Sequence, residues 1–435
     1  MRQLLVYLVI AILAFTSCKK EIEPKSEKEM DLEARDVLYD LMYDWYLWYD
    51  NIPEVNKNNY ESPYDLMPAM LYKPIDRWSY SVPLSVFESY YAGSFAGHGY
   101  SVGIDAENKA RIAMIYQKSN LYISGVRRGW EIKEVNNVDI APLIISGDGT
   151  TYNTVMGPKT VGITNTFLFG RPGKPDTTIV SAKSSFTVNS VLHFDTLHLS
   201  TGVTGHLVFE SFIEPSFNEL SEAFTFFKNN NITDLIIDLR YNGGGMLSVA
   251  HELASYIIGN GSADKVFVKY QHNIKRAGEN DETAFFKDTN LPMNLPRLVV
   301  ITSRESASAS EVIINSLKPH ITVTTVGDTT YGKPSGMYLF EYPQVNPIYA
   351  FVPVTFKLVN ADNEGDYFNG IPVDEYAPDD ITRDFSDRNE ASLAEAISVL
   401  TGSTTKSGYI YKTSFHVSER PDWQSNTFVR KEINP

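Results

Sequence analysis

The chain has 435 residues, of which 43% are hydrophobic and 12% aromatic, and its formal net charge is -15. This length favours two or three domains over a single core, and the apolar content argues against a disordered chain. Because the balance is acidic and no basic run follows residue 20, we expect no nucleic-acid partner.

The N-terminus begins with Arg2 and an apolar run from Leu4 to Phe15. A membrane helix needs about 20 apolar residues, so this shorter run is typical of an export signal. It ends at Cys18, the only cysteine, and this order resembles a bacterial lipoprotein signal. The resemblance implies a signal peptide over residues 1–18, lipidation of Cys18, and anchoring to a membrane of the cell envelope, either facing the periplasm or at the outer membrane. An ordinary secretory signal with an incidental cysteine is the alternative.

The remaining chain has no further cysteine, so the mature fold is predicted to lack disulfides and cysteine-bound metal. Residues 19–30 are rich in Lys, Glu, Pro and Ser, which predicts a flexible tether.

Residues 31–95 are expected to form a small helical subdomain. Apolar side chains recur there at helical spacing, at Leu38, Leu41, Met42, Trp45 and Trp48. Two further helices are predicted over Ser62–Tyr72 and Pro83–Tyr91. We interpret the aromatic face as packed core rather than as a ligand-binding site.

Residues 97–187 are expected to form a β-rich domain. The predicted strands are Tyr100–Ile104, Arg111–Tyr116, Thr160–Leu168 and Thr177–Ser181. Asn136 and Asn137 predict a two-residue hairpin turn. The polar, glycine-containing stretch 141–160 is expected to be a loop.

Residues 188–400 alternate between strand and helix patterns, which predicts an α/β core with a partly parallel sheet. The predicted strands are His206–Phe212, Asp234–Leu239, Arg297–Thr302 and Ile321–Val326, and the predicted helices are Ser216–Lys228, Met246–Ile258 and Ala309–Leu317. An antiparallel strand at Tyr349–Val359 and a closing helix at Asp387–Leu400 follow. Residues 401–435 are expected to be a loosely attached tail. The predicted fold class is therefore mixed, with an α/β core preceded by a helical and a β-rich part.

The first candidate catalytic residue is Ser308, in the run Ser306-Ala307-Ser308-Ala309-Ser310-Glu311. This run follows a predicted buried strand and opens a helix, so a small-residue turn exposes one side chain at the carboxyl end of the sheet. The helix N-terminus adds positive potential and backbone N–H groups, which favour an oxyanion. A serine that only caps the helix is the alternative.

Two other segments accompany this turn. Lys333 follows the next predicted strand, and a lysine whose pKa burial depresses can deprotonate a serine. The segment from Asp238 to Gly245 ends another strand in three glycines, whose backbone can approach a ligand closely. A solvated Lys333 and a phosphate-binding loop are the alternatives, although the Walker pattern is absent.

Together these segments resemble the C-terminal processing (tail-specific) peptidases, whose catalytic core is shared with the tricorn protease. The resemblance rests on Asp238-Leu239-Arg240-Tyr241-Asn242-Gly243-Gly244-Gly245, on the serine turn, and on Tyr331-Gly332-Lys333. Gly370-Ile371-Pro372-Val373-Asp374 is similar to a further family segment. Within residues 97–187, the stretch 125–137 resembles a PDZ module, which implies recognition of C-terminal peptides by strand addition.

The family resemblance implies a peptidase that acts on proteins or peptides and needs no cofactor. It implies that Ser308 is the nucleophile and that Lys333, 25 residues later, is the general base. Glu311 would orient the lysine, and the backbone N–H groups of Ala309 and Gly244 would form the oxyanion hole. The family often carries an Asp eleven residues after the serine, where this chain has Pro319, so that position has no catalytic part here.

Three other classes compete with this reading. A Ser-His-Asp hydrolase could draw on His251, His272 or His320, but no Gly-x-Ser-x-Gly turn occurs. A metalloenzyme is disfavoured because no His-Glu-x-x-His pattern occurs, so no metal is expected. A binding protein that keeps the fold without turnover remains the main alternative.

Overall fold

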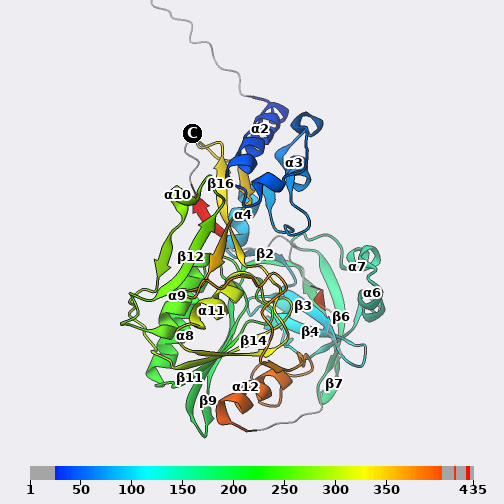
Figure 1. The fold of residues 1–435 in the computed structure, drawn as a ribbon. Coiled ribbons are helices and arrows are strands. Elements are labelled where there is room, and N and C mark those ends of the chain that lie inside the picture. The colour runs from blue at the N-terminus through cyan, green and yellow to red at the C-terminus, as the bar shows by residue number, and fades with distance from the viewer. Residues whose placement is uncertain (1–24, 404–415, 418–427, 432–435) are drawn as a thin grey trace, which may run out of the picture.

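The computed structural model describes residues 25–403, 416–417 and 428–431, and Figure 1 shows their arrangement. The predicted signal peptide and its Cys18 lie outside the described residues. Within them, no helix combines the length and apolarity that crossing a membrane requires.

A six-stranded sheet forms the centre of the region 188–400. Its order is β19-β15-β14-β11-β10-β9, and every neighbouring pair is parallel except β10 with β9. The strands are β9 (Val191–Leu199), β10 (Gly202–Phe209), β11 (Asp234–Asp238), β14 (Arg297–Thr302), β15 (Thr322–Gly327) and β19 (Glu375–Tyr376). The predicted α/β core with a partly parallel sheet is confirmed.

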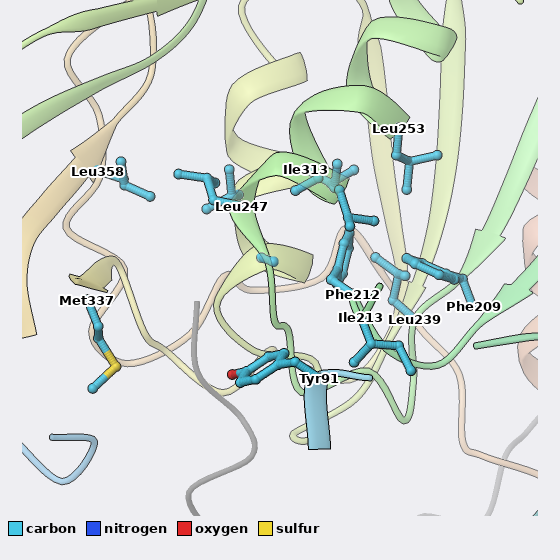
Figure 2. Packing of buried hydrophobic residues seen from close by; sticks show 14 of the residues in the cluster. Tyr91, Phe209, Phe212, Ile213, Leu239, Leu247, Leu253, Ile313, Met337 and Leu358 are labelled. Carbon is cyan, nitrogen blue, oxygen red and sulfur yellow. The ribbon is translucent and has the colours of Figure 1, made fainter. Parts of the chain in front are cut away.

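Helices cover both faces of this sheet, which explains why its strands read as continuous apolar runs. Leu235 and Ile237 of β11 join one hydrophobic cluster with α8, α9 and α11, whereas Ile236 joins a second cluster with α12. The helices are α8 (Ser216–Asn229), α9 (Leu247–Ile258), α11 (Ala309–Leu317) and α12 (Ala391–Thr401). Figure 2 shows Leu247 and Leu253 of α9 in the same cluster as Ile313 of α11 and Leu239.

A second sheet packs beside the first, in the order β1-β17-β16-β18-β12-β13. Its strands are β1 (Tyr80–Pro83), β12 (Val266–His272), β13 (Thr283–Phe285), β16 (Ser335–Tyr342), β17 (Tyr349–Val352) and β18 (Val354–Val359). The single strand predicted at Tyr349–Val359 is divided at Pro353, and both parts pair antiparallel with β16. A short helix, α10 (Ala277–Asn280), lies between β12 and β13.

The N-terminal region is helical, as predicted, but its first helix begins at Glu27, so the prediction of a flexible tether over 19–30 is wrong for its last four residues. It contains α2 (Glu27–Trp45), η1 (Tyr49–Asn51), η2 (Lys57–Asn59), α3 (Pro63–Met70) and α4 (Leu84–Tyr91). Ser26 begins α2 with a reciprocal capping box to Glu29. The apolar face from Leu38 to Met42 is buried in the main cluster, so the interpretation as packed core is confirmed.

The region 97–187 is β-rich, as predicted. The elements are β2 (Ser94–Gly97), β3 (Tyr100–Ile104), β4 (Ala110–Ile115), α5 (Asn120–Ile123), β5 (Glu131–Val135), α6 (Ala141–Ser146), α7 (Gly149–Met156), β6 (Thr164–Arg171), β7 (Lys174–Ala182) and β8 (Ser184–Thr187). Asn136 and Asn137 have φ of 52° and 62°, which suits the predicted tight turn.

The prediction of a loop at 141–160 is wrong, because this stretch forms α6 and α7. Asp148 caps α7 by accepting a hydrogen bond from the Thr151 N–H at 3.0 Å. Ile144 and Met156 are buried against the β-rich sheet. Tertiary burial of these two side chains outweighs the polar composition on which the prediction rested.

The C-terminal segment is more closely attached than a loose tail. Strand β20 (His416–Val417) pairs antiparallel with β3, and strand β21 (Phe428–Lys431) pairs parallel with β16. Figure 1 draws them as two red arrows, one on each sheet. Both strands add to the outer edge of a sheet.

Candidate active site

Ser308 lies in a sharp turn between β14 and α11. Its φ of 58° and ψ of -113° are unusual for a residue with a side chain. Such a backbone conformation costs on the order of 1–3 kcal/mol and persists only where surrounding contacts impose it. The residue is fully buried, at 0% exposure. The hydroxyl is therefore held at the N-terminus of α11, where the helix dipole favours negative charge.

Contacts to the glycine loop impose this turn. The Ser306 hydroxyl donates to the Leu239 carbonyl at 2.8 Å, at the end of β11. The Ala307 N–H and the Ser310 hydroxyl both donate to the Asn242 carbonyl, at 3.1 and 2.8 Å. The turn after β14 and the loop after β11 therefore meet at one edge of the sheet.

Gly244 approaches the serine turn so closely that only glycine fits. A Cβ added to it would lie 2.8 Å from Ser308 Cβ and 3.0 Å from Ala309 N, and its φ is 104°. Its own N–H donates to Asn242 Oδ1 at 2.9 Å. Within the described part of the chain, the Ala309 N–H donates to no group. Ser308, Ala309 and Gly244 are thus brought together. Of the two predicted oxyanion donors, the Ala309 N–H donates to no group among the described residues, and the Gly244 N–H donates to Asn242.

Lys333 is the other buried group of this site, and its exposure is 0%. It lies just before β16, with its Nζ 3.2 Å from Met337 Sδ and 5.9 Å from the centre of the Trp78 ring. Burial lowers the pKa of Lys333 well below its ordinary value, against the opposing attraction of Asp76 and Glu311. The alternative of a solvated loop lysine is therefore wrong.

Glu311 joins the turn that carries Ser308 to the segment that carries Lys333. Its Oε2 accepts the N–H groups of Ser308 and Lys333, both at 2.8 Å. Its Oε1 accepts the Thr330 hydroxyl at 2.6 Å and the Gly332 N–H at 2.7 Å. Glu311, which was predicted to orient Lys333, thus accepts hydrogen bonds from the backbone of both segments. Burial raises its pKa while these four hydrogen bonds oppose that shift.

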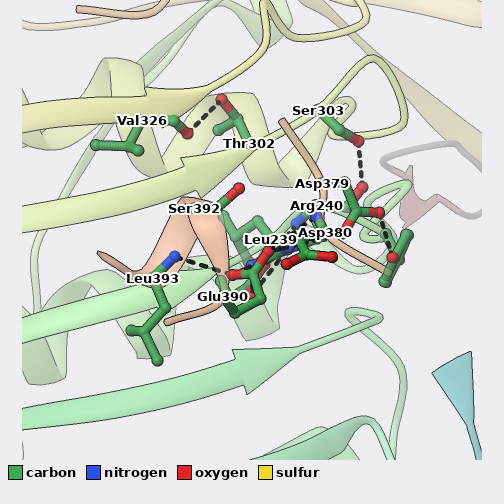
Figure 3. Close-up of polar contacts among 12 residues, drawn as sticks. Leu239, Arg240, Thr302, Ser303, Val326, Asp379, Asp380, Glu390, Ser392 and Leu393 are labelled. Atoms are coloured by element: carbon green, nitrogen blue, oxygen red, sulfur yellow. Dashed lines mark hydrogen bonds and ion pairs between the residues drawn. The ribbon is translucent and has the colours of Figure 1, made fainter. Parts of the chain in front are cut away.

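Behind the glycine loop, Arg240 is buried among three carboxylates. Its guanidinium contacts Asp238 at 2.8 Å, Asp379 at 2.8 Å and Glu390 at 2.8 Å. Figure 3 shows Arg240 among Asp379, Asp380 and Glu390, beside the hydrogen bond from the Leu393 N–H to the Glu390 carboxylate. Arg128, from the β-rich region, reaches the same cluster through Asp379 at 2.6 Å.

The three histidines considered for a Ser-His-Asp hydrolase contact other groups. His251 and His320 contact the carbonyls of Phe285 and Val266, and His272 contacts Asp281. In the described ranges, no group of three His, Cys, Asp or Glu side chains could hold a metal ion.

Several residues around the site escaped the sequence analysis. Asn242 lies inside the motif from Asp238 to Gly245, so its proximity to the site could be predicted. Its role as the hydrogen-bond acceptor of the Gly244 N–H could not. Asp76 and Trp78 lie more than 200 residues before Lys333, and no spacing rule connects them. Met337 lies four residues after Lys333, and its contact was not foreseen.

Two family descriptions match the chain. Residues 203–375 match "Peptidase family S41", and residues 33–80 match "Peptidase S41 N-terminal domain". The chain belongs to peptidase family S41. The resemblance to C-terminal processing peptidases is thereby confirmed at the level of the family.

Among curated proteins, this S41 member is similar to two proteases of Bacillus subtilis (strain 168). It is 24% identical to the carboxy-terminal processing protease CtpB over 240 residues, which are 55% of this chain and 47% of CtpB. It is 27% identical to the carboxy-terminal processing protease CtpA over 168 residues, which are 38% of this chain and 33% of CtpA. The chain thus spans less than half the length of these two relatives.

Among solved structures, the S41 member is similar to a protein from Bacteroides fragilis NCTC 9343 that is assigned to the S41 proteases. The TM-score is 0.68 at 20% identity, and the match covers 85% of this chain and 98% of the other. At this identity the likeness concerns the fold.

Proposed function

We propose that this S41 member is a serine endopeptidase that cleaves unstructured or C-terminal regions of proteins through an acyl-enzyme. Ser308 is the nucleophile and Lys333 the general base. One observation carries the proposal: a single carboxylate oxygen of Glu311 holds the backbone of both residues, and Lys333 is wholly buried. Burial lowers the pKa of the Lys333 amine well below its ordinary value, which favours the neutral form that can accept the hydroxyl proton.

The reaction then proceeds in two steps. The Ser308 oxygen attacks a peptide carbonyl as its proton passes to Lys333, and the amine product leaves with a proton from Lys333. Water then attacks the acyl-enzyme as its proton passes to Lys333. The bond between the acyl carbon and the Ser308 oxygen breaks, the carboxylic acid product leaves, and Lys333 returns the proton to the Ser308 oxygen. The tetrahedral oxyanion is stabilised by the Ala309 N–H, and each such donor contributes roughly 3–4 kcal/mol.

Gly244 is proposed as the second donor, and this assignment involves Asn242. The Gly244 N–H is bonded to Asn242 Oδ1, so it must exchange that acceptor for the oxyanion. The exchange keeps a buried donor satisfied before substrate arrives. Glu311 contributes by positioning the backbones of Ser308 and Lys333.

A Ser308→Ala variant tests the proposal. Wild type should hydrolyse an unstructured peptide ending in apolar residues, and Ser308→Ala should lose that hydrolysis while binding the peptide with unchanged affinity. Mass spectrometry of products and fluorescence anisotropy give the two readouts. The matched control is Ser303→Ala, a serine of the same turn whose hydroxyl donates to the Arg240 carbonyl. Hydrolysis that survives in Ser308→Ala would reject Ser308 as nucleophile.

The second candidate function is peptide binding without turnover. It is favoured if wild type and Ser308→Ala bind the peptide alike and neither yields products. The same experiment therefore separates the two functions.

We also propose that the protein is a lipoprotein of the cell envelope, anchored through Cys18. The support is the apolar run that ends at this single cysteine. Radiolabelled palmitate should enter the full-length chain and not a Cys18→Ser variant. A labelled Cys18→Ser protein would contradict the assignment.

A further inference from the structure

The two strands of the C-terminal segment extend two different sheets, β20 the β-rich sheet and β21 the sheet that contains β16. Strand β3 stands at one end of the β-rich sheet, next to β20 alone on its outer side. Strand β16 pairs on one side with the continuous line of β17 and β18, and on its other side with β21. Without β20 and β21, both β3 and β16 would present an open edge (Figure 1).

Open edges are sites where an extended polypeptide binds. A strand edge presents a row of unpaired N–H and carbonyl groups, and an extended peptide satisfies them by adding a strand. Such binding depends on the peptide backbone and not on particular side chains, so it suits a protein that accepts varied unstructured segments.

The edge of β16 leads directly to the proposed catalytic base. Met337 of β16 contacts Lys333 Nζ and is also the register partner of Phe428, the first residue of β21. Strand β21 also contacts α9, the helix that follows the glycine loop. A peptide on this edge therefore lies between β16, the strand that follows Lys333, and α9, the helix that follows Gly244.

We propose that the edges of β3 and β16 form one extended peptide-binding track, and that the C-terminal segment of this chain is its resident competitor. This inference rests on the proposed function and extends it: it says how the site binds a substrate and which segment of the chain competes with that substrate. Strand β20 begins at His416 and strand β21 ends at Lys431, so both pairings fall within a stretch of 16 positions in the sequence, and an unstructured substrate segment of similar length can pair with the same edges.

Attachment in cis explains how a few backbone pairs compete. A tethered segment acts at an effective concentration in the mM range, so even weak pairing occupies the edge for most of the time. A substrate must displace it, and its apparent affinity falls by the same factor. The segment therefore sets a threshold for substrate length and concentration without blocking the chemistry.

Binding can be measured apart from turnover in the Ser308→Ala background. The probe is a fluorescein-labelled peptide with the sequence of residues 404–435, and the receptors are the Ser308→Ala chain ending at residue 435 and the same chain ending at Ser403. The shortened chain should bind the probe about tenfold more tightly, given an effective concentration in the mM range. Equal affinities, or weaker binding to the shortened chain, would overturn the proposal.

A second pair of variants guards against misfolding of the shortened chain. Val429→Pro with Arg430→Pro removes two backbone N–H donors from β21, one on each side of the strand. Val429→Ala with Arg430→Ala keeps both donors and serves as the matched control. The proline variant should bind the probe like the shortened chain, and the alanine variant like the intact one. Identical affinities of the two variants would overturn the place of β21 on the track.

Turnover separates this proposal from the proposed function. With Ser308 intact, shortening the chain should lower KM for an unstructured peptide and leave kcat unchanged, and added 404–435 peptide should restore the higher KM. If products form equally in both chains at equal KM, the competitor is refuted and the peptidase stands. If neither chain forms products but the binding difference persists, the competitor stands and the peptidase is refuted.

Discussion

At the residue scale, the site is organised by backbone contacts as much as by side chains. Ser308 is held at positive φ, and Glu311 receives N–H groups from both sides of the site. The carboxylate joins the backbone of Ser308 to that of Lys333, 25 residues later, so it fixes the separation of these two segments. The ability of Ser308 to react then depends on whether the Lys333 amine is protonated.

Lys333→Met removes the buried amine and keeps an unbranched apolar side chain. The loss of a general base should lower kcat by about 10²–10⁴-fold. At neutral pH the variant should unfold at higher urea concentration, because wild type bears the cost of a buried amine whose charged form is desolvated.

The pH dependence of stability has a definite sign. The folded-state pKa of Lys333 lies below that of the unfolded chain, so between the two values the unfolded chain binds more protons. The free energy of unfolding of wild type therefore rises with pH across that window, by at most about 1.4 kcal/mol per pH unit, relative to Lys333→Met. Urea unfolding of both proteins from pH 7 to pH 10 measures the difference. A constant difference would refute the depressed pKa.

Hydrolysis should follow the same titration. Since the neutral amine is the active form, kcat/KM should rise with pH as Lys333 loses its proton and should level off below the ordinary pKa of lysine. A rate that falls through the neutral range would contradict the role of Lys333 as base.

Gly244→Ala places a methyl group against the serine turn. It would meet Ser308 Cβ at 2.8 Å and the Ala307 carbonyl at 2.9 Å, so the turn must shift. We expect kcat to fall at least 100-fold, the size expected for a displaced oxyanion donor. Gly261→Ala is the matched control, because its φ of 81° is also positive but no atom lies within 4 Å of the added Cβ. The control should lose only about 1–2 kcal/mol of stability and keep its kcat.

At the scale of elements, the N-terminal region helps to enclose the base. The segment between α3 and β1 brings Trp78 to Lys333, and Trp78 is only 4% exposed. Asp76 beside it accepts hydrogen bonds from the Tyr46 hydroxyl and the Ser79 hydroxyl, at 2.8 and 2.6 Å. This segment therefore contributes to the burial that lowers the pKa of Lys333.

Trp78→Ala opens this side of the site to water. The pKa of Lys333 should rise toward that of a solvated lysine, and the midpoint of the kcat/KM profile should move to higher pH. Trp48→Ala, which removes a ring that packs on Tyr46, should leave the midpoint in place. The two pH profiles decide the matter, and coincident midpoints would show that Trp78 does not shield the base.

The elements that could be predicted from the sequence are those whose pattern is set locally. Buried parallel strands such as β11 and β14 are unbroken apolar runs, and the turns after them carry distinctive small residues. Strands β12 and β16 were missed because they mix polar and aromatic residues and owe their pairing to distant partners. The motif residues Ser308, Glu311 and Lys333 were likewise found from local order.

Other parts of the site depend on contacts that no local pattern encodes. Trp78 reaches Lys333 across more than 200 residues of chain, and the pairing of β20 with β3 joins segments more than 300 residues apart. Such pairings are set by the packing of whole elements. A polar tail therefore looked loosely attached, although two pieces of it complete sheet edges.

At the scale of the whole molecule, one charge cluster joins three regions. Arg128 comes from the β-rich region, Arg240 from the turn that follows β11, and Asp379 and Glu390 from the segment before α12. Because Arg240 directly precedes the loop, the position of that loop depends on residues far along the chain.

Glu390→Gln tests this dependence. The substitution keeps the shape of the side chain but removes one charge from the cluster, and leaving a buried guanidinium undercompensated costs about 3–5 kcal/mol. Urea unfolding should show that loss together with a lower kcat. Asp176→Asn, which breaks the exposed pair with Lys133, is the control and should change neither quantity.

The same cluster bears on when a newly made molecule becomes active. Asp379 and Glu390 follow Arg240 by 139 and 150 residues, so the ribosome synthesises the guanidinium well before these two carboxylates. Until those two carboxylates arrive, the guanidinium behind the glycine loop lacks most of its counter-charge, and the loop lacks its support. We therefore expect the glycine loop to reach its final position only when synthesis of the chain is almost complete.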